Sequence, residues 1–203
     1  MPDRIPLFPL ELVLFPGAAL PLHIFEPRYK LMVGRCLEQK QPFGIVLARG
    51  EGIAAVGCTA QIVLVISAYP DGRLDILTAG VRRFRIGELF DDLPYLQADV
   101  NFLDDEPRQP LRDFPSLLNL YEQCHRLIHG RPPDPPDNNS KISPAYQIAI
   151  ALPLELEFKQ DLLETRSEQE RQATLIERFR EWLPQLEHRD RVRRKASGNG
   201  HAH

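Results

Sequence analysis

The stretch Ile5–Tyr29, IPLFPLELVLFPGAALPLHIFEPRY, decides how the chain begins to fold. It is rich in apolar residues, but five prolines interrupt it, at positions 6, 9, 16, 21 and 27. A proline fixes φ and removes a backbone N–H donor, so this stretch cannot form one long helix or one central strand. We therefore predict short extended segments joined by fixed bends.

A helix and several strands follow. Pro27 stands at a first-turn position that proline tolerates, and apolar residues recur at the spacing of one helical face over residues 27–40. Strands are predicted where β-branched and aromatic residues are concentrated, at residues 43–48, 60–69, 73–78, 81–86 and 95–103. Pro70-Asp71-Gly72 supplies turn chemistry for a hairpin, and Gly80 is expected to break the strand run. One helix among short strands predicts a mainly antiparallel β pseudo-barrel over residues 1–106.

From residue 111 the apolar period changes from two to 3.6, which indicates helices. Four helical segments are predicted to begin near residues 114, 144, 154 and 168, and Pro184 weakens the last of them. The fold class is therefore α+β, with a C-terminal helical bundle after the β domain. We expect a helical subdomain at 107–187 with a mobile, proline-rich loop at 130–141, and a disordered basic tail at 188–203.

Several motifs together resemble the N-terminal, substrate-binding domain of Lon proteases. They are Phe15-Pro16-Gly17, His23-Ile24-Phe25-Glu26 followed by Arg28-Tyr29, the strand Gly80–Ile86, and the KQDLLE segment Lys159–Glu164. The resemblance covers roughly residues 4–183. It implies a PUA-like β domain followed by helices, in a module that in the protease recognises protein substrates.

Motifs for catalysis are absent from the sequence. No glycine-rich segment continues into Gly-Lys-Ser or Gly-Lys-Thr, the element that binds the phosphates of ATP, and none of the five lysines lies in a Ser-Lys peptidase motif. His125 and His129 have a spacing that suits zinc, but no further ligand stands near them. We expect a non-enzymatic, stand-alone member of the family without ATPase or protease domains, with no catalytic residues, no cofactor and no metal.

The opening stretch also supplies the candidate binding residues. Residues 10–15 are almost continuously apolar, so both faces of a strand there must be covered. The helix at 27–40 and neighbouring strands can cover one face, and the other meets either the helical half, which would seal it, or a client in a groove between the opening segment and the helical half. The candidates are Leu12, Leu14, Phe15, Leu20, Leu22 and Phe25. Glu26 and Arg28 stand among apolar residues, and we expect Glu26 to pair with the arginines that follow Gly80. The set Glu26, Arg28, Arg83 and Arg85 is therefore either a structural ion cluster or a site for a peptide carboxylate.

The composition indicates the location of the protein and the state of its cysteines. The chain has a net charge of −3, no apolar run of the ~18–20 residues that span a bilayer, and no signal-peptide pattern, so we expect a cytoplasmic protein without membrane contact. Its three separated cysteines, Cys36, Cys58 and Cys124, are expected to be reduced core thiols.

The leading functional hypothesis is binding of unfolded or exposed apolar polypeptide segments, as an adaptor or chaperone-like factor in protein quality control that works with a protease or a chaperone. The alternative is RNA binding through the arginine strand and the basic tail, against which the acidic balance counts. A third hypothesis is an enzyme that acts on a small molecule, but the sequence offers no nucleophile paired with a general base.

Overall fold

The computed structural model describes residues 3–107, 113–137, 140 and 142–198, which form six strands and five helices. The chain divides into two compact units. The first unit comprises Met1–Asp104 with Leu154–Arg166, and the second comprises Asp105–Pro153 with Ser167–His203.

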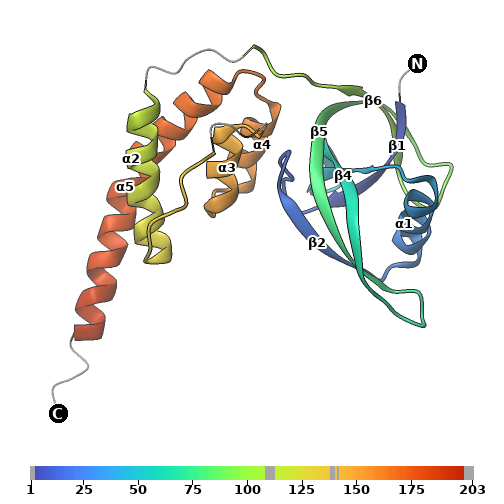
Figure 1. The fold of residues 1–203 in the computed structure, drawn as a ribbon, viewed down its shortest axis with the longest axis horizontal. Helices are drawn as coiled ribbons and strands as arrows, with labels where there is room; N and C mark the ends of the chain where they lie inside the picture. The colour runs from blue at the N-terminus through green and yellow to red at the C-terminus, as the bar shows by residue number, and fades with distance from the viewer. Residues whose placement is uncertain (1–2, 108–112, 138–139, 141, 199–203) are drawn as a thin grey trace. The chain divides into compact units, whose positions relative to one another are not determined.

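The first unit is built on one mostly antiparallel sheet. Its strands are β1 (Asp3–Leu10), β2 (Ala19–Ile24), β3 (Phe43–Arg49), β4 (Gly52–Ala68), β5 (Leu74–Phe90) and β6 (Gln97–Phe102). Their order is β2-β5-β4-β3-β1-β6, with β1 parallel to β3, and a further pairing of β5 with β6 closes the sheet (Figure 1). The α+β class and the predicted pseudo-barrel are confirmed.

Side chains from several strands fill the barrel, and one helix packs against it. Its buried core includes Leu7, Val46 and Phe84. The predicted helix is present as α1 (Pro27–Gln39) (Figure 1). The ring of its Tyr29 stacks on Phe8 of β1 with 4.0 Å between centroids. This contact ties the helix to the strand that opens the chain.

The structure corrects the prediction for Gly80, because β5 continues through it. A Cβ atom at this position would lie 2.1 Å from the carbonyl oxygen of Phe15. The Gly80 N–H donates to the carbonyl of Ala18 at 2.9 Å, and its own carbonyl accepts from Gly17 at 2.8 Å. Glycine is therefore needed here for the close approach of another backbone segment, and it does not end the strand.

Helix α4 (Leu156–Glu164) packs in the first unit, whereas the sequence suggested that it belongs to the helical subdomain. Arg83, which is 3% exposed, donates to the carbonyls of Leu163 at 2.7 Å and Thr165 at 2.8 Å. The Gln160 amide donates to the Val56 carbonyl at 2.9 Å. These bonds join α4 to β4 and β5. Because they link residues about eighty or more positions apart, local periodicity could not assign them.

The second unit consists of α2 (Phe114–His129), α3 (Pro144–Ala151) and α5 (Glu168–Gly198). The expected helix ends are present: Gly130 at φ 72° ends α2, and the Ser143 hydroxyl accepts from the Tyr146 N–H to begin α3. None of the described helices combines the length and apolar character needed to cross a bilayer.

Helix α5 differs from the sequence prediction at its C-terminal end. It runs past Pro184 to Gly198, whereas disorder was expected from residue 188. An ion pair between Arg194 and Asp190, at 2.7 Å and one turn apart, stabilises the helix in the predicted tail. Residues 199–203 of that tail, and residues 138, 139 and 141 of the predicted loop 130–141, lie outside the described residues.

Candidate functional site

The most exposed apolar segment of the first unit lies on β4. Strand β3 pairs with β4 only over residues 52–60, and no described strand lies along that edge of β4 over residues 61–68. Four consecutive residues there, Val63, Leu64, Val65 and Ile66, are 37–61% exposed. An unpaired strand edge presents free backbone N–H and C=O groups, to which an extended chain can add. We call Val63–Ile66, together with Phe25 and Tyr69, the β4 edge surface.

Two bulges produce this exposure. The register between β4 and β5 shifts between Ile62 and Leu64, and again between Val65 and Ser67, so Val63 and Ile66 have no partner on β5. A bulge leaves its extra residue unpaired and increases the local twist of the strand. The bulges therefore turn a run that would otherwise alternate between the two faces into consecutive exposed side chains.

The outer face of the sheet continues the apolar surface across three strands. Leu64 of β4 lies opposite Leu77 of β5, and Leu77 lies opposite Pro21 of β2. Directly opposed residues point to the same face, whereas their neighbours on β5, Ile76 and Thr78, are fully buried on the other. The next row carries the polar groups.

A hydrogen-bonded cluster occupies this next row. The Asp75 carboxylate is 2.6 Å from His23 Nδ1, and its second oxygen accepts from the Tyr69 hydroxyl at 2.6 Å. Those hydrogen bonds, first from Tyr69 and then from His23, lower the pKa of Asp75. The ring of Phe25 stacks on the His23 imidazole with 5.9 Å between centroids, while Tyr69 meets it edge-on at 6.2 Å. The cluster thus holds Phe25, which is 59% exposed, in a defined position.

The turn of the hairpin is fixed as well. Gly72 adopts φ 82°, and the Tyr69 N–H donates to the Arg73 carbonyl at 2.9 Å across the predicted turn. The Lys30 ammonium of α1 donates to the Asp71 carbonyl, also at 2.9 Å. The exposed apolar side chains therefore lie on a hairpin whose turn is held by hydrogen bonds. The prediction of a hairpin at this turn is confirmed.

The polar side chains of the β4 edge surface and its neighbours form a closed set of contacts. No group of three or more potential metal ligands occurs among the described residues. In the second unit, His125 donates to the Arg131 carbonyl at 2.9 Å and His129 to the Ala151 carbonyl at 3.1 Å. What the β4 edge surface offers is apolar area and unpaired backbone groups.

The structure divides the binding residues predicted from the opening stretch. Leu14 and Phe15 are 3% and 2% exposed, so the structure corrects their assignment: they are core residues. Leu12, Leu20 and Leu22 are half-buried, and Phe25 is exposed. Strand β1 ends at Leu10, so the rest of the apolar run is not the strand that was expected, and Leu14 and Phe15 pack into the protein's own interior.

The predicted ion cluster is also corrected. Glu26 is partly exposed and pairs with Arg28 at 2.9 Å, two residues along the chain, instead of with the arginines of β5. The buried Arg83 donates to the end of α4, and Arg85 is exposed. A carboxylate at the start of α1 can reach solvent, so its position among apolar residues did not imply burial.

Sequence reasoning missed Val63–Ile66. The run Val-Leu-Val-Ile lacks the alternation of a half-buried strand, which would normally indicate burial on both faces. None of the described strands pairs with this edge of β4 over residues 61–68, because β3 is shorter than β4. How far β3 extends along β4 depends on long-range pairing, which the local sequence does not show.

Comparison with known proteins defines the class of this fold. A family model described as the ATP-dependent protease La (LON) substrate-binding domain matches residues 4–179. A crystal structure of a Lon N-terminal domain protein from Xanthomonas campestris has a TM-score of 0.65 and 26% identity, and covers 86% of this chain and 97% of that one. The N-terminal domain of a Mycobacterium avium complex Lon protease has a TM-score of 0.60 at 17% identity, covering 87% and 98%, and is similar in fold alone.

Lon proteases are also similar in sequence. That of Parabacteroides distasonis is 31% identical over 144 residues, which cover 66% of this chain and 17% of the protease. That of Cytophaga hutchinsonii is 27% identical over 204 residues, or 92% and 25% of the two chains. The chain belongs to the family of Lon substrate-binding domains, as its motifs predicted. It spans a quarter or less of these proteases and corresponds to their substrate-binding part, not to the ATPase or protease part.

Proposed function

We propose that this chain is a non-catalytic module that binds unfolded or exposed apolar segments of other polypeptides. One observation carries the proposal: an exposed apolar run, Val63–Ile66, lies on a strand edge that no described strand pairs with. The membership in the substrate-binding family supports it.

An unfolded polypeptide matches both features of this edge. Its free backbone groups can add to the β4 edge as a further strand, which supplies affinity that does not depend on sequence. Its apolar side chains can pack against Leu64 and Phe25, which selects segments that a folded protein would bury. Contiguous exposed apolar surface is costly in a soluble protein unless it serves such an interaction.

The proposal extends to the cellular role. A module that recognises clients without hydrolysing ATP or peptide bonds would act as an adaptor or chaperone-like factor in protein quality control in the cytoplasm, and would transfer clients to a protease or a chaperone. Such a module shows no turnover of ATP or casein after rigorous purification. Turnover that follows the protein peak would contradict the non-catalytic part.

The β4 edge surface can be tested with a matched pair of variants. Leu64 and Leu89 are similarly exposed, at 55% and 47%, but Leu89 lies at the far end of β5. Fluorescence anisotropy would follow labelled α-lactalbumin that is reduced and carboxymethylated and so stays unfolded. We expect Leu64→Ser to weaken binding at least about fivefold, as for a contact residue worth about 1 kcal/mol, and Leu89→Ser to leave it unchanged.

Two results would reject this function. One is equal binding of native and unfolded lactalbumin, and the other is an equal effect of the two leucine substitutions. RNA binding, the alternative, receives less support from β5, because the Arg83 guanidinium is buried against carbonyls and Arg82 pairs with Asp104 at 3.3 Å. Tighter binding of RNA than of unfolded protein would favour that alternative.

A further inference from the structure

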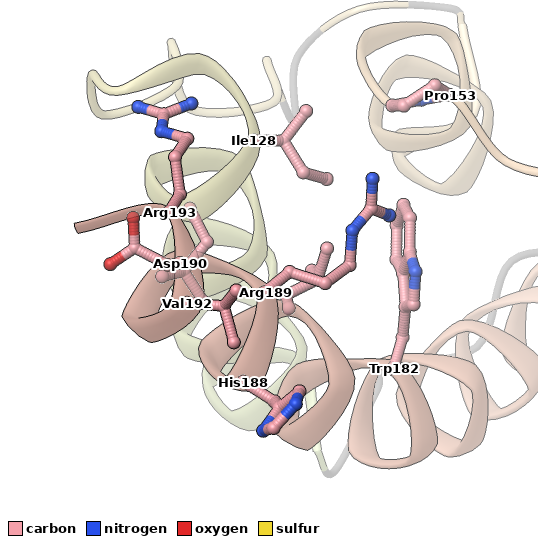
Figure 2. Close-up of a pocket in the computed structure, with 10 residues that line it drawn as sticks. Ile128, Pro153, Trp182, His188, Arg189, Asp190, Val192 and Arg193 are labelled. Atoms are coloured by element: carbon pink, nitrogen blue, oxygen red, sulfur yellow. The ribbon is translucent and has the colours of Figure 1, made fainter. Parts of the chain in front are cut away.

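The second unit contains a cavity whose lining shares no residue with the β4 edge surface. It has a volume of about 610 Å³ and lies between the C-terminal end of α2 and the C-terminal half of α5 (Figure 2). Residues that line it include Leu127, Ile128, Trp182, Leu186, Arg189 and Arg193. Its size is within the range of small-ligand sites in proteins, about 300–1,000 Å³.

One stripe of α5 forms the longer wall of the cavity. Trp182, Leu186, Arg189 and Arg193 recur at i, i+4, i+7 and i+11, the spacing of a single helical face. Figure 2 shows the side chains of Trp182 and Arg189 extending into the same space. An aromatic ring and a guanidinium group therefore face the same part of the cavity (Figure 2).

One guanidinium group in the lining of this cavity is not engaged by a described residue. Arg189 has no hydrogen bond or ion pair with any residue that the structure describes. Among the described lining residues, Asp190 is the only carboxylate, and it pairs with Arg194 at 2.7 Å. The cavity therefore presents positive charge to a ligand, next to half-buried apolar side chains of α2 and α5.

We propose that this cavity binds the C-terminus of a polypeptide that ends in a large apolar residue. The apolar side chain would pack against Trp182, Ile128 and Leu186, and the terminal carboxylate would accept hydrogen bonds from Arg189. Arginine suits this role because its planar fork matches a carboxylate and stays charged. A nucleotide fits less well, since the lining offers few groups to read the edge of a base.

This inference rests on the proposed function, because it adds a second contact for polypeptide clients. It also explains how a binding module could recognise a chain end as distinct from an internal apolar segment. The β4 edge surface needs only an extended backbone, whereas this cavity requires a free carboxylate.

Two labelled hexapeptides of the same sequence, Gly-Ser-Gly-Ala-Leu-Phe, would test the site, one with a free C-terminal carboxylate and one with an amide. We expect the acid to bind at least about tenfold more tightly, the effect of a charge-assisted pair. The fluorescence of Trp182, the only tryptophan, should change as the acid binds.

Variants separate the site from general electrostatic attraction. Arg189→Gln should abolish the preference for the acid, whereas Arg191→Gln, which removes the same charge from an exposed position outside the lining, should preserve it. Trp182→Ala should weaken both peptides, with circular dichroism used to verify folding of every variant.

The proposal fails if acid and amide bind equally, if both arginine substitutions have the same effect, or if AMP or octanoate binds more tightly than the peptide acid. Leu64→Ser should leave hexapeptide binding unchanged while it weakens binding of unfolded lactalbumin. Failure of the cavity and failure of the proposed function would thus be seen separately.

Discussion

Replacing Arg171 with Gln tests the main polar contact of the second unit. The Arg171 side chain is fully buried and donates to both oxygens of Asp105, at 3.1 and 2.7 Å. It also contacts the Glu168 carboxylate, which is 6% exposed, at 2.9 Å, and the Tyr146 hydroxyl at 2.8 Å. Burial opposes the charge, but the bond to Asp105 and the nearby negative charges outweigh it, so the pKa of Arg171 is raised.

The magnitude follows from what the substitution leaves behind. Removing one partner of a buried ion pair costs about 3–5 kcal/mol, because the other charge stays buried without compensation. Glu168 would keep hydrogen bonds from the Ala145 N–H and from Gln172, so we expect the lower end, about 3 kcal/mol. Arg126→Gln is the control: its pair with Glu122 is exposed and contributes about 0.3–0.5 kcal/mol.

Urea unfolding followed by tryptophan fluorescence is the assay. Trp182 is the only tryptophan and lies in the second unit, so its signal reports this unit even if the two units unfold separately. A loss of less than about 1 kcal/mol for Arg171→Gln, or a loss equal to that of Arg126→Gln, would refute the argument. Combining Arg171→Gln with Glu168→Gln should cost less than the sum of the two, because it also removes the stranded charge.

Three further results are expected. Gly80→Ala should destabilise the protein by about 1–3 kcal/mol, because the new Cβ would lie 2.1 Å from the Phe15 carbonyl oxygen. Gly34→Ala, inside α1 and with open space around its Cβ, should stabilise the protein by about 0.5–1 kcal/mol. Equal effects of the two substitutions in urea unfolding would contradict this. Burial raises the pKa of the free thiols of Cys36, Cys58 and Cys124 to about 11 or 12. Ellman's reagent at pH 8 should therefore react slowly with the native protein and quickly with the unfolded protein. The folded-state pKa of Asp75 is lowered, so its contribution to stability is present above pH 3.8 and is lost as the pH falls through the folded-state pKa. NMR titration should give a pKa of Asp75 below 3.8, and Tyr69→Phe should raise it. An unshifted pKa in both proteins would exclude the hydrogen bond.

Local signals in the sequence identified most elements. Proline at the start of α1, the Ser143 cap of α3 and the turn at residues 70–72 each act within a few residues, so their chemistry can be read directly. The buried cysteines were likewise correctly predicted. These features depend on backbone conformation and burial, which short patterns encode well.

Features that depend on distant partners could not be predicted. Gly80 continues a strand because the backbone near Phe15 approaches it, and α4 joins the first unit because Arg83 caps its last carbonyls. The candidate site follows the same rule. Phe25 was predicted and is exposed, but Val63–Ile66 became visible only once the pairing of β3 with β4 was known. An apolar run predicts that cover is needed, but not which surface supplies it.

Amide hydrogen exchange with and without unfolded lactalbumin tests the central claim most directly. If a client adds to the open edge of β4, exchange should slow at residues 61–68, where no described strand covers that edge, and around Phe25. The paired segment at residues 52–60 should change little, which provides an internal control. Protection confined to the second unit, or no protection at residues 61–68 under saturating client, would contradict polypeptide binding at the β4 edge surface.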